Sequence, residues 1–282
     1  MSVESELPIW DHLDELAKRL RRILFSVMIS TIIIVSIPSD FSQIIRLDFK
    51  DYRPLISLVI TSIEDHFLPQ GVTLIALNWL DTFTVYIVVG VVMGTLISLP
   101  LIAFELYKFI NPALYSHERR MVLSFTLAFS ALFSIGALYA YFILLPITFN
   151  VLLRFVYGTG VSPLFSILDF FNLVAFSILG SGLFYTLPLI VFILVRINLL
   201  EVETLRENRR KVFIGLVVMT AIITPDPTPL SMLLMSIPFY LLYETTIQVI
   251  GRIVKNKKRE EIIAEGLKAS KRLLAIEKEI QF

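Results

Sequence analysis

Long stretches without a charged residue constrain this chain more than any other feature. Among them are residues 23–39, 82–104, 121–153, 170–195, 212–225 and 227–243. A helix needs about 20 residues to cross about 30 Å of hydrocarbon, and three of the stretches reach 33, 26 and 23 residues. Because 56% of the chain is hydrophobic and only 17% is charged, a soluble domain could not bury this much apolar surface. The pattern indicates a helical protein that crosses a membrane several times.

We predict an all-α fold with six transmembrane helices in one membrane domain, residues 1–250, followed by a charged amphipathic tail over residues 251–282. The expected spans are residues 23–37, 82–104, 121–145, 167–195, 212–223 and 230–250. The fifth would be about 18 Å long at 1.5 Å per residue, so a re-entrant segment is the alternative to a short crossing. Residues 224–229, Thr-Pro-Asp-Pro-Thr-Pro, predict a turn before the sixth span, since proline does not continue a helix.

Lysine and arginine are divided unevenly between the two sides of these spans. One side carries 21 of the 25, and the other carries only Arg46, Lys50, Arg53 and Arg154. By the positive-inside rule, both termini are cytoplasmic and the chain is a multi-pass protein of the cell membrane. The segment 38–81 then lies outside, where its apolar patches predict an extracytoplasmic cap of helices or loops on the membrane surface.

Glycine and proline inside the spans predict how the helices pack. Gly90 and Gly94 match the small-xxx-small pattern that lets two helices approach closely, within this chain or between two chains. Pro100, Pro188 and Pro238 each permit a kink, and kinked helices can enclose a concave surface.

Residues suited to catalysis are scarce. The chain has no cysteine, its three histidines lie outside the spans, and no P-loop motif occurs, so we expect no catalytic residue, metal or cofactor. A net charge of +1 gives no support for a nucleic-acid partner. Ser181, Tyr185 and Thr186 are the polar residues that an intramembrane enzyme could use, but no base accompanies them. A secondary transporter of a small solute is the alternative function, although neither a mid-membrane coupling site nor an internal repeat is visible.

Two glutamates stand in basic surroundings beside the predicted spans. Glu15 lies in the segment His12-Leu-Asp-Glu-Leu-Ala-Lys-Arg-Leu20, and Glu118 directly precedes two arginines at the start of the third span. If both ends are cytoplasmic, the two carboxylates lie at similar depth and could bind two guanidinium groups through bidentate hydrogen bonds. The alternative is that each carboxylate neutralises a neighbouring lysine or arginine.

At these residues the chain resembles the TatC family, the core membrane subunit of the twin-arginine protein translocase. The matching segments are His12 to Leu20, Leu68-Pro-Gln-Gly71, Phe109-Ile-Asn-Pro-Ala-Leu-Tyr-Ser-His-Glu-Arg-Arg120, Ala140-Tyr-Phe142 with Pro146, Thr224-Pro-Asp226, Ile237-Pro238 and Leu242-Tyr-Glu244. The resemblance implies six spans in a cupped, concave arrangement. It also implies a receptor for signal peptides with two consecutive arginines, which exports folded precursor proteins by the proton-motive force together with TatA-like and TatB-like single-span partners, with self-association possible.

The resemblance also implies roles for particular residues. On the cytoplasmic side, Glu15 and Glu118 would bind the arginine pair, Phe109 would line the same site, and Arg19 would support the recognition segment.

On the outer side, Pro54 would belong to the cap, while Tyr141 and Asp226 would be functionally sensitive positions. Thr186 stands where the family usually has an acidic or amide residue in the fourth span, and a threonine cannot hold a charge there. Ala17 likewise replaces a usual arginine.

Overall fold

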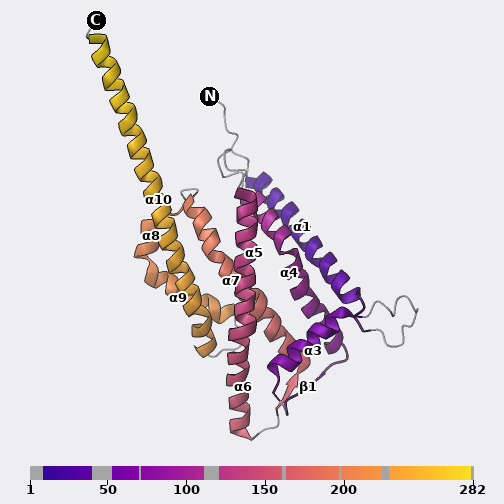
Figure 1. Cartoon of the computed structure of the whole chain (residues 1–282). Helices are drawn as coiled ribbons and strands as arrows, with labels where there is room; N and C mark the ends of the chain where they lie inside the picture. Colours follow the sequence, from indigo (N-terminus) through magenta and orange to yellow (C-terminus); the bar gives the residue numbers. More distant parts are fainter. Residues whose placement is uncertain are drawn as a thin grey trace.

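The structure, a computed structural model, describes residues 9–39, 53–69, 71–110, 121–160, 163–196, 199–223 and 229–280. Most of these residues are helical. The α-helices are α1 (Ile9–Ser36), α3 (Leu55–Phe67), α4 (Asp81–Ile110), α5 (Met121–Tyr139), α6 (Leu145–Thr159), α7 (Ile167–Arg196), α8 (Val202–Glu207), α9 (Arg209–Ile223) and α10 (Pro229–Ile280). A π-helical turn, η2 (Ala140–Leu144), joins α5 to α6. The long helices stand side by side as a bundle (Figure 1), which confirms the all-α prediction.

Four of the described helical segments are long and apolar enough to cross a membrane: Asp81–Phe109, Val122–Thr159, Ile167–Val195 and Met232–Ile253. The predicted first and fifth spans lie in α1 and α9. Neither helix is among the four: α1 combines a basic N-terminal half with an apolar C-terminal half, and α9 has only 15 residues. Since α1 packs along α4, and α9 packs against α10, both belong to the bundle. The total of six crossings remains a prediction.

Small residues bring α1 and α4 into close contact. A Cβ atom built on Gly94 would lie 2.5 Å from the Thr31 hydroxyl oxygen. That hydroxyl donates a hydrogen bond of 3.3 Å to the carbonyl oxygen of Gly90. Further along the interface, the Ser98 hydroxyl lies 3.0 Å from that of Ser30 and 3.1 Å from that of Ser26. The small-xxx-small pattern therefore marks a packing face within this chain.

The predicted prolines lie inside helices, and one further proline marks an unexpected turn. Pro100, Pro188 and Pro238 are interior residues of α4, α7 and α10. The helix begun by α5 continues through η2 and α6 to Thr159, beyond the predicted end at residue 145. Because Pro146 cannot donate to the carbonyl four residues before it, a regular helix would be interrupted here. In η2 the Leu145 amide donates to Ala140 five residues earlier, and this wider turn carries the helix past the proline.

One end of the bundle is covered by α3 and a short sheet, and we call it the cap end. The buried face of α3 carries Ile56, Ile60, Ile63 and Phe67. Strand β1 (Thr73–Ile75) pairs in parallel with β2 (Leu164–Ser166), which precedes α7. Before α3, the isolated bridge between Pro38 and Pro54 returns the chain to the end of α1. These elements form the cap predicted for the segment 38–81.

The last span and the predicted tail form one helix. Helix α10 has 52 residues and is about 78 Å long at 1.5 Å per residue. Its C-terminal part extends beyond the other helices at the end of the bundle opposite the cap (Figure 1). The boundary predicted at residue 251 is therefore not a break in secondary structure. The sequence from residue 252 onward is rich in Lys, Glu and Ile and contains one glycine, Gly266, and no proline, so it has no strong helix breaker.

The contact of α1 with α4 should not tolerate a larger residue at position 94. In Gly94→Ala the new methyl group would lie 3.0 Å from the backbone oxygen of Val27, so the helices must separate. Overpacking of this kind costs about 1–3 kcal/mol. We expect the midpoint of thermal unfolding in detergent, followed by circular dichroism, to fall. In the control Gly215→Ala no described atom lies within 4 Å of the new carbon, and the midpoint should not fall. Equal midpoints for both variants would contradict close packing.

Candidate functional site

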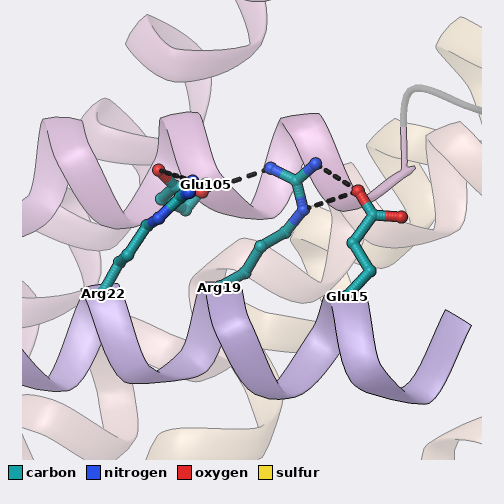
Figure 2. Close-up of polar contacts among 4 residues, drawn as sticks. All are labelled: Glu15, Arg19, Arg22 and Glu105. Carbon is teal, nitrogen blue, oxygen red and sulfur yellow. Dashed lines mark hydrogen bonds and ion pairs between the residues drawn. The ribbon is translucent and has the colours of Figure 1, made fainter. Parts of the chain in front are cut away.

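Four charged residues form a cluster at the bundle end opposite the cap, between the N-terminal half of α1 and the last turns of α4 (Figure 2). We call it the rim cluster: Glu15, Arg19, Arg22 and Glu105. Arg19 donates from Nε, at 3.0 Å, and from Nη2 to Oε1 of Glu15. Its Nη1 donates to Oε2 of Glu105 at 3.2 Å. Arg22 donates from Nη1 to the other oxygen of Glu105 at 3.4 Å. Arg19 therefore joins carboxylates from two helices.

Helical spacing explains the arrangement. Residues 15, 19 and 22 follow the i, i+4, i+7 pattern, so they share one face of α1. That face lies against α4, whose close approach is set further along by Gly90 and Gly94. Lys18 and Asp14 pair at 2.7 Å on a different face, where both side chains are about two-thirds exposed. A pair that exposed contributes little to stability.

Burial distinguishes the members of the rim cluster. The Glu105 side chain is 8% exposed and that of Arg19 is 15% exposed, whereas Glu15 is 30% and Arg22 is 63% exposed. A buried carboxylate is stable in its charged form only when it is paired. Arg19 supplies the closer partner of Glu105, while Arg22 reaches it from the surface. Glu105 and Arg19 are thus the interior of the cluster, and Glu15 is its exposed carboxylate.

The structure relates two of the predicted binding residues to this cluster. Glu15 and Arg19 are members of it. Phe109, in the last turn of α4, is partly buried and follows Glu105 by four residues, so it lies on the same side of the helix. Glu118, like Asp226 near the start of α10, lies outside the described residues.

Sequence reasoning did not identify Glu105. It is the first charged residue after the second charge-free stretch, and the predicted topology places it on the same side as Arg19 and Arg22. Those two facts were the available signal. What the sequence does not reveal is that the residue is buried, because burial depends on the rotation of α4 against α1.

At the cap end, Tyr141 connects η2 to α3. Its ring stacks on that of His66 with centroids 4.9 Å apart, and it meets Phe67 edge-on at 5.1 Å. Pro54 immediately precedes α3, as expected for a cap residue. Partial burial, together with the negative charge of the aspartate that follows, raises the pKa of the Glu64 carboxyl on α3. A proton therefore binds this carboxyl at a higher pH than it would bind an exposed glutamate.

Several buried polar side chains in the described part of the bundle carry hydroxyls. Thr186 is fully buried and donates to the carbonyl oxygen of Leu183 at 2.6 Å. The hydroxyl of Tyr139 donates to the carbonyl oxygen of Leu234 at 2.6 Å and so ties α5 to α10. In the described part of the chain no three Asp, Glu, His or Cys side chains gather as a metal site requires. The Tyr139 hydrogen bond joins two helices, the Thr186 hydrogen bond lies within α7, and neither side chain carries a charge for coupling to an ion.

An apolar groove lies between α3, α4, α5 and α7. Its volume is about 650 Å³, and residues from all four helices line it, among them Val59, Met93, Leu96, Ala137, Phe171 and Ile178. The α4 lining residue nearest to the rim cluster is Leu99, six residues before Glu105, a rise of about 9 Å. The groove therefore begins one to three turns of α4 below the rim cluster and extends toward the cap end.

These features define a class of protein. A bundle of membrane-length helices with an apolar groove and a cluster of carboxylates and guanidinium groups at one end is suited to binding and transport, not to catalysis. The family model described as Sec-independent protein translocase protein (TatC) matches residues 11–238. The chain belongs to this family.

Individual relatives agree with the family match. The TatC protein of Escherichia coli strain K12 is 31% identical over 244 residues, which cover 86% of this chain and 88% of the relative. That of Aquifex aeolicus is 32% identical over 194 residues, covering 67% and 78%. Two crystal structures of the twin-arginine translocase receptor TatC, both 28% identical, superpose with TM-scores of 0.68 and 0.70. They cover 86% and 84% of this chain and 99% and 98% of their own.

The comparisons confirm the principal functional prediction. The chain is a component of a protein translocase, neither an enzyme nor a carrier of small solutes.

The unequal burial of the two arginines predicts unequal effects on stability. Among the described residues, Arg19→Gln leaves Glu105 with the 3.4 Å contact to Arg22 as its ion pair. Hydrogen bonds to charged groups contribute about 1.5–3 kcal/mol, and we expect a loss of that size. Arg22→Gln should cost less than about 1 kcal/mol, as for other exposed ion pairs. Thermal unfolding of the two variants beside the wild type measures the difference, and a larger effect of Arg22→Gln would refute the assignment of Glu105 to the interior.

Proposed function

We propose that this protein is the signal-peptide receptor of a twin-arginine translocase, and that Glu15 binds one of the two consecutive arginines of the signal. The observation that carries the proposal is the contact of Glu15 with Arg19, in which one carboxylate oxygen accepts two N–H groups of a single guanidinium. This carboxylate is partly exposed, so it can be reached from outside the bundle. A guanidinium from a peptide would be bound by the same kind of hydrogen bonds.

The second arginine is assigned to Glu118. This residue precedes the start of α5 at Met121 by three positions, and α5 starts at the same end of the bundle where α4 ends with Glu105 and Phe109. The proximity of those helix ends supports a site formed jointly by α1, the end of α4 and the start of α5. Phe109 would contribute apolar contact beside the charged groups.

The apolar segment of the signal would occupy the groove. Signal peptides place an apolar region after their basic residues, and the groove begins about 9 Å below Glu105 along α4. Met93 and Leu96 supply its α4 wall, so these apolar contacts lie on the helix that packs against α1, which carries Glu15. Burial of apolar side chains there would add affinity without sequence specificity.

We further propose an orientation in the membrane. We place the rim cluster and both termini in the cytoplasm, where the signals of folded precursor proteins arrive, and the cap outside. Transport would be driven by the proton-motive force with TatA-like and TatB-like single-span subunits, and copies of the chain could self-associate. Pro54, Tyr141 and Asp226 would act at the cap side, and Thr186 would pack helices without carrying a proton.

Binding of a synthetic peptide tests the site. We expect a twin-arginine signal peptide to bind the purified chain in detergent, and Glu15→Ala or Glu118→Ala to weaken it at least about tenfold, because a charged hydrogen bond contributes about 1.5–3 kcal/mol. Fluorescence polarisation of a labelled peptide gives the dissociation constants.

Two controls accompany the peptide measurement. A peptide with two lysines should bind more weakly, since lysine lacks the planar fork of arginine. Asp14→Ala removes a carboxylate of the exposed surface and should leave the affinity unchanged. Wild-type affinity in both glutamate variants would exclude the proposed carboxylate roles.

The orientation can be tested with single cysteines, because the chain has none of its own. Lys255→Cys, on the exposed surface of α10, should react with a membrane-impermeant maleimide only after the cells are opened. Thr61→Cys, on the exposed surface of the cap helix α3, should react in intact spheroplasts. The reverse pattern would invert the proposed topology.

A further inference from the structure

In this structure Glu15 already binds a guanidinium of the chain itself. Both N–H groups that Arg19 presents to it reach the same oxygen, Oε1. The second oxygen, Oε2, points away from Arg19 (Figure 2). An arginine arriving from a peptide would therefore meet a carboxylate whose strongest interaction is internal, and it would compete with Arg19 for it.

If Arg19 had no carboxylate partner besides Glu15, it would keep Glu15 in competition with a peptide arginine. A guanidinium that is 15% exposed is poorly hydrated, so leaving Glu15 without a substitute would cost several hydrogen bonds. Glu105 provides the substitute, since its Oε2 accepts Nη1 of Arg19 at 3.2 Å. It belongs to a different helix and is 8% exposed, so its position does not depend on α1 alone.

We propose that Glu105 is a positioning residue for signal-peptide binding. It retains Arg19 at the rim cluster while a peptide arginine takes the place of Arg19 on Glu15. This inference rests on the proposed function and adds a residue that acts through Arg19, without touching the peptide.

The charges of the cluster fit such an exchange. Two carboxylates and two guanidinium groups balance as the structure stands. A third guanidinium would leave an excess positive charge, unless one of the present ones moves into water. Arg22 is suited to do so, because its side chain is 63% exposed and its contact with Glu105 is the longest in the cluster, at 3.4 Å. When Arg22 moves into water, Glu105 pairs with Arg19, and Glu15 pairs with the peptide arginine.

A double-mutant cycle tests the proposal in the full-length chain, with the labelled twin-arginine peptide as probe. In the wild-type background, Glu105→Gln commits Arg19 to Glu15, and we expect the peptide to bind about tenfold more weakly, as for the loss of a charged hydrogen bond. In an Arg19→Gln background there is no internal competitor, so the same substitution should change the dissociation constant less than about twofold. Equal effects in both backgrounds would overturn the exchange.

A matched control separates positioning from loosening of the helix pair. Ser98→Ala also acts at the interface of α1 with α4, where it removes the hydroxyl contacts with Ser26 and Ser30. It changes no charge and should reduce thermal stability while the peptide affinity stays at the wild-type value. A loss of affinity like that of Glu105→Gln would show that Glu105 acts only through packing, and would overturn the proposal.

Failure of this inference can be distinguished from failure of the proposed function. If the wild-type chain binds the peptide and Glu15→Ala abolishes binding, while Glu105→Gln binds as the wild type does, then only the role of Glu105 is refuted. If the affinity of Glu15→Ala also equals that of the wild type, the peptide does not use this carboxylate and both proposals fall.

Discussion

The burial of a negative charge between α1 and α4 is the constraint on which the candidate site depends. Glu105 is almost completely covered, and a carboxylate in that position must be compensated by nearby positive charge. Arg19 provides the compensation and, with the rest of its fork, orients Glu15 at the edge of the bundle. The position of Glu15 thus depends on Arg19, which is held in place because the buried Glu105 must be paired with a positive charge.

Helix α4 unites the parts of the molecule. Gly90 and Gly94 of α4 allow α1 to pack closely against it. The C-terminal turns of α4 carry Glu105 and Phe109, and its middle forms a wall of the apolar groove. A signal peptide with charged residues followed by apolar ones would meet the two kinds of surface in the same order. Recognition by shape and charge explains why a translocase component needs no catalytic group.

The parts of the fold that were predictable depend on local properties of the sequence. Charge-free stretches located the membrane-length helices, and the spacing of Gly90 and Gly94 located a packing face. The π-helical turn before Pro146 was not predicted, and neither was the single helix that joins the last span to the tail. Each depends on how two neighbouring segments join, which the pattern of either segment alone does not show. In the site, Glu15 was singled out by its basic surroundings and by the resemblance, and Arg19 by the resemblance alone, whereas Glu105 was missed.

By itself the sequence determined which segments are helical and apolar, and where positive charge collects along the chain, because hydropathy and charge belong to each residue wherever it lies. Only the tertiary structure decided which carboxylate is buried and which guanidinium it pairs with. The contact of Arg19 with Glu105 joins residues 86 positions apart. Its existence depends on the rotation and separation of two helices, whose close approach is set at Gly90 and Gly94.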